Sequence, residues 1–212
     1  MRIRKKPWAP QELAENPRIL RDAEAYKGKM AEFFGNDNPI HLELGCGKGR
    51  FIAKTAAASP QINHVAVERE ATVLAVAARL SRDIDASLVF LLLDGAELTD
   101  YFNPGEIKRL YINFCDPWHR RKKWAKRRLT HANFLKIYES LGIPEIFFKT
   151  DNRILFEFSI NQFSQEGWIM RNISLDLHNS TWASDSLDEN IMTEYEEKFS
   201  GKGPIYRLEA YK

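Results

Sequence analysis

Short runs of β-branched and aliphatic residues alternate along the chain with longer stretches in which apolar residues recur at helical spacing. This alternation is typical of a parallel β-sheet whose strands are connected by helices. The short runs predict seven strands, at Ile40–Leu44, His64–Glu68, Leu88–Leu93, Arg109–Phe114, Glu145–Lys149, Trp168–Leu175 and Ile205–Tyr211. The longer stretches predict helices at Glu24–Phe34, Arg50–Ala58, Thr72–Ser81, Thr130–Ser140 and Arg153–Gln165, with a shorter one near Thr193–Phe199.

Glycine and proline lie at the joins between these elements, and no repeat, low-complexity tract or long linker divides the chain. Its 212 residues, of which 44% are hydrophobic, are enough to bury a good core. We therefore expect a single α/β domain over residues 1–212, with residues 1–35 as a basic N-terminal extension packed on it.

The stretch IHLELGCGKGRF, residues 40–51, places a strand directly before Gly45, Gly47 and Gly49 and then begins a helix. Glycines allow a tight turn and the close approach of a ligand, and the helix start offers free N–H groups. The third glycine comes one residue sooner than in the dinucleotide fingerprint. Glu43 would repel a pyrophosphate and attract an ammonium group. The turn therefore favours the amino-acid end of S-adenosylmethionine over NAD.

Acidic residues stand at or just after the carboxyl ends of the next three predicted strands. Glu68, with Glu70 as the alternative, can accept hydrogen bonds from ribose hydroxyls, and Asp94 can hold the adenine amino group or serve only as a helix cap. Asp116 follows the fourth strand, where Asp-Pro-Trp could also be only a turn. Because parallel strands end at one edge of a sheet, these side chains should lie close together. The predicted cofactor site is Glu43, Gly45, Gly47, Gly49, Glu68, Asp94 and Asp116.

The positive charge is concentrated in two segments although the formal net charge is only +2. One segment holds Arg2, Arg4, Lys5 and Lys6, and the other holds Arg120, Arg121, Lys122, Lys123, Lys126, Arg127 and Arg128. Without these eleven, 20 basic residues remain against 29 acids. Such an electrostatic face is typical of a protein that binds phosphate groups, although a solvated charge run is the alternative.

The second basic segment begins within four positions of Asp116, so we expect a polyanionic substrate beside the reacting centre. It has too few large apolar residues for a membrane-surface helix. Trp118 and Trp124 can stack on exposed bases, as aromatic side chains do in RNA recognition, or pack inside the protein.

Four motifs occur in the same chain: LELGCGKGRF, NFCDPW followed by KRRL, KTDN, and TEYEEKF with GPIYRLEA. Together they resemble the bacterial tRNA (guanine-N7-)-methyltransferases, which methylate guanosine 46 in the variable loop. The resemblance covers nearly the whole chain. It implies the class I S-adenosylmethionine-dependent methyltransferase (Rossmann-like) fold, with a seven-stranded, mostly parallel sheet, an antiparallel last strand and helices on both faces.

The resemblance also implies roles for single residues. Asp116 would be the catalytic residue, and a basic residue four positions after it, Arg120, would contact the substrate; one extra residue before KRRL leaves Arg121 as the alternative. The other implied substrate contacts are Asp151, Thr193, Glu194, Tyr195 and Glu196.

Guanine N7 carries a lone pair and no proton, so the reaction needs no base. The protein must align N7 with the methyl group and stabilise the cationic product. Asp116, Asp151 and Glu196 can accept hydrogen bonds from the N1–H and N2–H₂ edge of the base. The predicted RNA-binding residues are Arg121, Lys122, Lys123, Trp124, Lys126, Arg127 and Arg128.

The segment 175–196 is long and polar for a connection inside a compact domain. We expect it to become ordered on RNA binding, with a mobile surface loop as the alternative. Two competing functions remain at this point. One is methylation of an exocyclic base amine, to which NFCDPW bears a faint likeness, and the other is RNA binding without catalysis.

Other classes of site lack support in the sequence. The five histidines show no metal spacing, and His41 and His64 lie in predicted strands as core histidines. The cysteines Cys46 and Cys115 have no partner pattern, and no apolar stretch suggests secretion or a membrane span. We therefore expect a cytoplasmic protein, monomeric or homodimeric, without metal or membrane partner.

Overall fold

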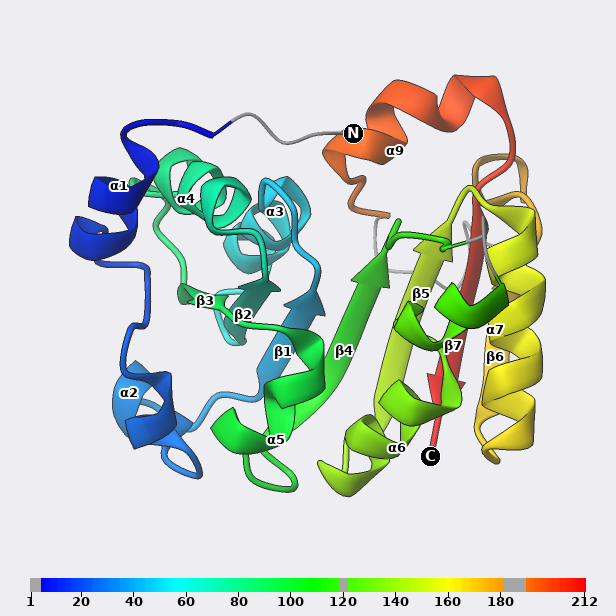
Figure 1. Ribbon diagram of the computed structural model, residues 1–212, viewed down its shortest axis with the longest axis horizontal. Helices are drawn as coiled ribbons and strands as arrows, with labels where there is room; N and C mark the ends of the chain where they lie inside the picture. The colour runs from blue at the N-terminus through cyan, green and yellow to red at the C-terminus, as the bar shows by residue number, and fades with distance from the viewer. Residues whose placement is uncertain (1–4, 119–121, 181–189) are drawn as a thin grey trace.

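The computed structural model describes residues 5–118, 122–180 and 190–212, with Lys122 described by its backbone. It contains one seven-stranded sheet in the order β3-β2-β1-β4-β5-β7-β6 (Figure 1). The strands are β1 Ile40–Leu44, β2 Asn63–Glu68, β3 Leu88–Leu92, β4 Ile107–Asn113, β5 Glu145–Thr150, β6 Ile169–Ser174 and β7 Tyr206–Tyr211. The last strand, β7, runs antiparallel to both of its neighbours, and the other pairs are parallel. The predicted strand number and direction are confirmed.

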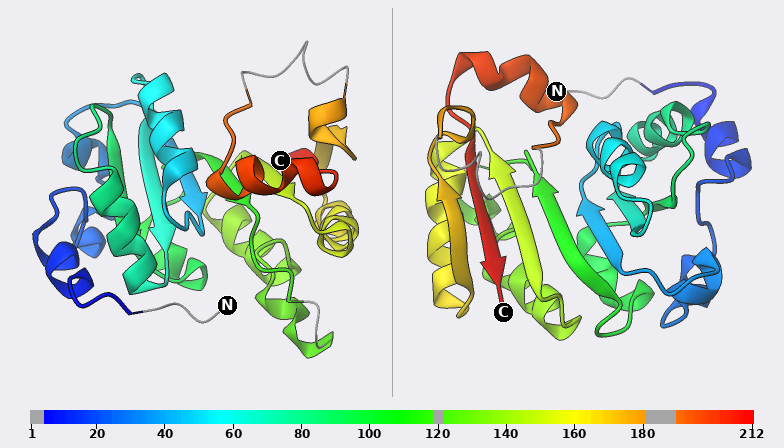
Figure 2. Two further views of the ribbon diagram at one scale, coloured as in Figure 1. Left: turned by 90° about the horizontal axis from the view of Figure 1, so that it is seen from above. Right: turned by 180° about the vertical axis from the view of Figure 1, so that it is seen from behind.

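Helices cover the sheet. The α-helices are α1 Ala9–Glu15, α2 Met30–Phe34, α3 Arg50–Ala58, α4 Ala71–Leu80, α5 Leu98–Tyr101, α6 Ala132–Ser140, α7 Arg153–Gln165 and α9 Glu194–Phe199. The 3₁₀ turns are η1 Ala23–Tyr26, η2 Gly95–Glu97, η3 Lys122–Arg127, η4 Leu177–Asn179 and η5 Ser200–Lys202. Two cores result, one between the sheet and α5, α6 and α7, and one between the sheet and α3 and α4 (Figure 2).

The alternation of side chains along β1 decides which residue enters which core. Leu42 and Leu44 pack into the core under α5, α6 and α7. Since successive side chains of a strand point to opposite faces, Glu43 points to the other side, where it meets Asn113 of β4. Glu43 is therefore enclosed beneath α3, with its side chain away from the first core.

The predicted helix at Glu24–Phe34 is wrong, because Gly28 interrupts it. Gly28 adopts φ +74°, which a helix cannot contain, and its N–H donates to the Glu106 carboxylate at 3.0 Å. A Cβ at this position would collide with the Asn103 amide. The chain accordingly forms the short turn η1 and then α2 in place of one long helix.

The sequence pattern also missed α1, which packs against α4. The Arg79 guanidinium lies 4.6 Å from the centre of the Trp8 ring, and Ile19 pairs with Phe90 of β3 in an isolated parallel bridge. The N-terminal segment thus adds to the outer edge of the sheet and to the helix that covers it.

Candidate active site

A cavity of about 230 Å³ opens at the carboxyl ends of β1 to β4. Its walls include Gly45, Glu68, Asp94, Asp116 and Arg127. Adjacent parallel strands deliver these residues to the same edge of the sheet, which is where open α/β sheets bind ligands. Three predicted acids and one residue of the basic segment therefore border a single space.

Of the three glycines of the turn, Gly45 lines this cavity, whereas Gly47 and Gly49 are not among its lining residues. Gly45, Gly47 and Gly49 have φ of 78°, 56° and 73°, in the left-handed region that glycine adopts without steric cost. A Cβ at Gly49 would also lie 3.0 Å from Ala77 Cβ and from the Phe90 ring. Apart from Gly47 and its two chain neighbours, no heavy atom of the described residues lies within 4 Å of a Cβ added at Gly47, so the backbone of the turn is open on this side.

Glu68 stands at the end of β2 and contacts the glycine turn directly. Its Oε2 accepts from the Gly47 N–H at 3.1 Å and its Oε1 accepts from the Glu70 N–H at 3.0 Å. Burial raises the pKa of Glu68 above its ordinary value, and these backbone donors oppose the rise. Glu70 lies outside the cavity and borders a separate shallow hollow with Arg69 and Asp94.

Asp94 caps a 3₁₀ turn and also lines the cavity. Its Oδ1 accepts from the Ala96 N–H at 3.0 Å and so caps η2. The same side chain lines the cavity, with its Oδ2 4.0 Å from Arg69. The cap fixes the carboxylate in place without removing it from the cavity.

Glu43 lies beneath the glycine turn and is not among the residues that line the cavity. The residue is 2% exposed, and its Oε1 accepts from the Asn113 amide at 2.9 Å. Its Oε2 has no hydrogen-bond partner among the residues that the structure describes. Burial raises the pKa of Glu43 to about 8, although Asn113 and the charge of Lys149 act in the opposite direction. Asn113 was not singled out in the sequence, where its place at the end of a strand beside β1 was the available signal.

The Asp-Pro-Trp segment is held in an unusual backbone conformation. Phe114 and Trp118, on either side of Asp116, have φ of 50° and 44°, which few non-glycine residues adopt. The Arg128 Nε donates to the Pro117 carbonyl at 2.8 Å, and the Phe114 N–H donates to the Lys149 carbonyl at 2.9 Å. Asp116 itself is exposed at the cavity.

Trp118, Arg69 and Arg127 also line the cavity, and Trp124 packs against Trp118 and Arg127. The Trp118 and Trp124 rings meet edge to face with centres 5.9 Å apart. The Arg127 guanidinium lies 5.0 Å from the Trp118 centre, and the Arg69 guanidinium lies 5.9 Å from it. Trp118 thus packs within the protein and also lines the cavity.

The basic segment divides into outward and inward side chains. Lys123, Lys126 and Arg127 are exposed, whereas Arg128 is buried and lies 4.3 Å from the centre of the Phe158 ring. Of the N-terminal basic residues, Lys5 and Lys6 are exposed. Four predicted contacts, namely Arg2, Arg4, Arg120 and Arg121, lie outside the described residues, as does the side chain of Lys122.

The predicted substrate contacts fall into two groups. The Tyr195 hydroxyl donates to Asp151 Oδ2 at 2.9 Å, and the Tyr195 ring centre lies 5.1 Å from that of Phe114, a residue of the cavity wall. Both Asp151 and Tyr195 are exposed. This pair therefore lies beside the cavity that Asp116 borders.

The remaining residues of the TEYE segment, Thr193, Glu194 and Glu196, make contacts within the protein. Thr193 and Glu196 form a capping box at the start of α9, and Glu194 forms an exposed ion pair with Lys48 of the glycine turn at 2.7 Å. The Glu196 side chain is 0% exposed and pairs with Lys149 at 2.7 Å. Lys149 was not singled out in the sequence. Residues 181–189 of the segment 175–196 lie outside the described residues, so its ordering on RNA binding stays a prediction.

Within the residues that the structure describes, no group of His, Cys, Asp and Glu side chains is arranged to hold a metal ion. None of the helices in this part of the chain is long and apolar enough to cross a membrane. Cys46 and Cys115 are both free thiols, and burial raises the pKa of Cys115 to about 12.

A family model described as "Putative methyltransferase" matches residues 37–208. The chain is 51% identical to the tRNA (guanine-N(7)-)-methyltransferase of Bacillus subtilis (strain 168), over 99% of this chain and 98% of that protein. It is 49% identical to the tRNA (guanine-N(7)-)-methyltransferase of Streptococcus suis (strain 05ZYH33), over 99% of each chain.

Solved structures share the fold at low sequence identity. The 16S rRNA methyltransferase KamB superposes with a TM-score of 0.59 at 12% identity, over 87% of this chain and 92% of that one. A 16S rRNA (adenine(1408)-N(1))-methyltransferase from Catenulisporales acidiphilia with the cosubstrate SAM has a TM-score of 0.55 at 14% identity, over 87% and 90% of the two chains. The predicted class I methyltransferase fold is confirmed.

Proposed function

The chain belongs to the family of the tRNA (guanine-N(7)-)-methyltransferases, and from this premise we propose that it transfers a methyl group from S-adenosyl-L-methionine to N7 of guanosine 46 in the variable loop of tRNA. The observation that carries the proposal is the shared cavity, which is lined by the acids Glu68, Asp94 and Asp116 and also by Arg127 of the basic segment. One nucleotide can therefore reach the acids while its phosphates meet the basic segment.

The residues of the cavity fit a cationic cofactor. Glu68 and Asp94 line the cavity and are placed to take the ribose hydroxyls and the adenine amino group. Behind these lining residues, Glu43 lies under the glycine turn with a carboxylate oxygen that has no hydrogen-bond partner among the described residues, and an ammonium group would satisfy it. When bound, S-adenosylmethionine supplies a methyl group on a positively charged sulfur.

The protein's part in the reaction is alignment and charge stabilisation. Asp116 and Asp151 accept hydrogen bonds from the N–H groups of the guanine edge, which orients N7 toward the methyl group. As N7 forms its new bond the purine becomes cationic, and the two carboxylates stabilise this charge. Tyr195 donates to Asp151 and so holds that carboxylate in one orientation. No general base is needed, because N7 carries no proton.

The exposed basic residues supply the phosphate contacts in this scheme. Lys123, Lys126 and Arg127 lie on η3, directly after the Asp116 segment. Each phosphate contact releases counterions, so tRNA affinity should fall steeply with salt, with a slope of about 0.7 to 0.9 per contact on logarithmic axes. We also propose a cytoplasmic location, which the two free thiols favour.

The decisive experiment is incubation of the protein with unmodified tRNA and methyl-labelled cofactor, followed by nucleoside analysis and mapping of the labelled position. We expect 7-methylguanosine at position 46. A neutral methylamine product would instead indicate transfer to an exocyclic amine, and binding of tRNA without cofactor binding would indicate an RNA-binding module without catalysis.

Single-turnover methyl transfer tests the role of Asp116. We expect Asp116→Ala to slow the transfer by about 100-fold or more, because it removes a charge beside the developing cation. Asp100→Ala, which changes an exposed acid of α5 at the opposite end of the sheet, is the matched control (Figure 1). A rate for Asp116→Ala near that of the unchanged protein would remove this residue from the chemistry.

A further inference from the structure

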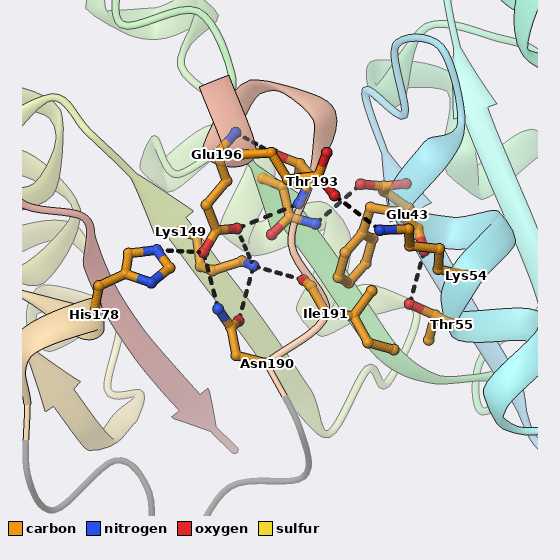
Figure 3. A network of polar contacts seen from close by, with 12 residues as sticks. Glu43, Lys54, Thr55, Lys149, His178, Asn190, Ile191, Thr193 and Glu196 are labelled. Carbon is orange, nitrogen blue, oxygen red and sulfur yellow. Dashed lines mark hydrogen bonds and ion pairs between the residues drawn. The ribbon is translucent and has the colours of Figure 1, made fainter. Parts of the chain in front are cut away.

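A buried ion pair joins α9 to the central sheet. Lys149, at the carboxyl end of β5, places its Nζ 2.7 Å from Oε2 of Glu196, with side chains 7% and 0% exposed. Figure 3 shows the lysine amine between Glu196, Asn190 and the backbone carbonyl of Ile191. Two charges enclosed in this way destabilise the fold unless each is fully paired.

Both members of the pair make further polar contacts within the protein. Oε1 of Glu196 accepts from the Asn190 amide at 3.0 Å and lies 3.1 Å from His178 Nε2. Oε2 of Glu196 also accepts from the Thr193 N–H at 3.4 Å. Lys149 donates further to Asn190 Oδ1 at 3.2 Å and to the Ile191 carbonyl at 3.1 Å. The Glu196 carboxylate is directed into the protein and makes its contacts there.

The residues next to this pair form the exposed contact at the cavity. Asp151 comes two residues after Lys149, and Tyr195 comes one residue before Glu196. The hydroxyl of Tyr195 donates to Asp151 at 2.9 Å, so two cross-links between the same two segments lie side by side, one buried and one exposed. A shift of α9 that breaks the buried link also displaces the exposed one.

Helix α9 has only six residues and needs such support. A helix of this length is not stable by itself in water, so its position is set by tertiary contacts. Its outer residues Glu194 and Glu197 form exposed ion pairs, Glu194 with Lys48 and Glu197 with both Lys54 and Arg50. Exposed pairs contribute little to stability, so the buried Lys149 link and the contact of the Tyr195 ring with Phe114 are the main contacts that position the helix.

We propose that Lys149 is a positioning residue for methyl transfer: its buried pair with Glu196 holds α9 where Tyr195 orients the Asp151 carboxylate toward the guanine. This inference rests on the proposed function. Glu196 acts in it from inside the protein, as the partner of Lys149, and the substrate contacts of this region are Asp151 and Tyr195.

Steady-state kinetics of Lys149→Met tests the proposal, with Lys54→Met as the matched control because it removes an exposed ion pair of the same helix. We expect Lys149→Met to raise KM for tRNA about tenfold, because the Tyr195–Asp151 contact that the pair supports lies on the substrate side. Lys54→Met should change KM for tRNA by less than about twofold. Circular dichroism and thermal unfolding establish that each variant is folded.

A double-substitution cycle separates a positioning role from direct contact of Glu196 with the base. If the pair acts as one unit, Lys149→Met combined with Glu196→Gln is no more impaired than either single variant. This double variant also removes the unpaired buried charge, so it remains informative where Lys149→Met alone unfolds. Losses that multiply in the double variant overturn the proposal, since they mean that Glu196 contacts the substrate independently.

A second double-substitution cycle tests whether Lys149 acts through Tyr195. In a Tyr195→Phe background, which lacks the hydroxyl donor to Asp151, Lys149→Met should add less than about twofold to KM for tRNA. A full tenfold increase in that background means that Lys149 does not act through Tyr195. If the unchanged protein fails to methylate tRNA, the proposed function fails; if it methylates tRNA and Lys149→Met does so equally well, the positioning role alone fails.

Discussion

The burial of Glu43 should make the stability of the fold depend on pH. The residue is 2% exposed and burial raises its pKa from 4.5 to about 8. In the folded chain the carboxyl therefore keeps a proton that the unfolded chain has released at any pH between these two values. Because the folded state binds more protons in this window, the free energy of unfolding falls as the pH rises from 4.5 to about 8.

The size of this effect follows from the two pKa values. A difference of one proton between the two states changes the free energy of unfolding by about 1.36 kcal/mol per pH unit. Allowing for partial titration at each end, the free energy of unfolding falls by about 3 kcal/mol between pH 5 and pH 8. For a domain of roughly this length, 1 kcal/mol corresponds to about 2 to 4 °C in melting temperature. The contribution of Glu43 is thus about 6 to 12 °C across this range.

Urea unfolding of the unchanged protein and of Glu43→Gln at several pH values between 5 and 8 measures the effect. Glutamine has a similar size and does not titrate, so the difference between the two proteins isolates this carboxyl, while contributions from His41 and His64 occur in both and cancel. We expect the difference to move by about 3 kcal/mol in favour of the variant as the pH rises. Glu70→Gln, which changes an exposed acid near the same turn, controls for the loss of one negative charge. A difference that stays constant from pH 5 to pH 8 would refute the account of Glu43.

Three further predictions concern other parts of the molecule. Burial lowers the pKa of His64 to about 4, so the unfolding free energy should fall as the pH drops from about 6.5 toward 4, and His64→Phe should flatten this decline in urea titrations. Asp94→Ala removes the cap on η2 and a wall of the cavity, so we expect a loss of about 1 kcal/mol in stability and weaker cofactor binding by calorimetric titration. Arg127→Ala should reduce the salt dependence of tRNA binding by about one phosphate contact, with little change in melting temperature. Arg128→Ala removes the hydrogen bond to the Pro117 carbonyl and should lower the melting temperature instead. The reverse result would mean that Arg128 contacts phosphate and that Arg127 stabilises the fold.

Much of the arrangement at the sheet edge could be predicted, because it follows from topology. Once β1 to β4 are parallel neighbours, the residues that end them must meet, and Glu68, Asp94 and Asp116 do border one cavity. The strand positions were predictable for a similar reason, since buried parallel strands form continuous apolar runs.

The direction of single side chains was harder to predict. Lys149 and Glu196 are 47 residues apart, and no local pattern shows that two charged residues will pair inside the protein. The spacing of Thr193 and Glu196 is that of a capping box and could have indicated that this glutamate turns toward its own helix start. Likewise, a run of basic residues shows how much charge is present and does not show that Arg128 points inward. Such outcomes depend on packing between segments distant in sequence.

The two left-handed residues around Asp116 have a consequence for substitution at this turn. Glycine would adopt the φ of Phe114 and Trp118 without steric cost, whereas a non-glycine residue there destabilises the backbone by roughly 1 kcal/mol or more. Replacement by glycine would relieve that strain and remove the Phe114 ring from Tyr195 and the Trp118 ring from Arg127. A glycine variant that melts at a higher temperature and methylates more slowly would show that the rings at these two positions increase the rate of methyl transfer and lower the stability of the folded protein.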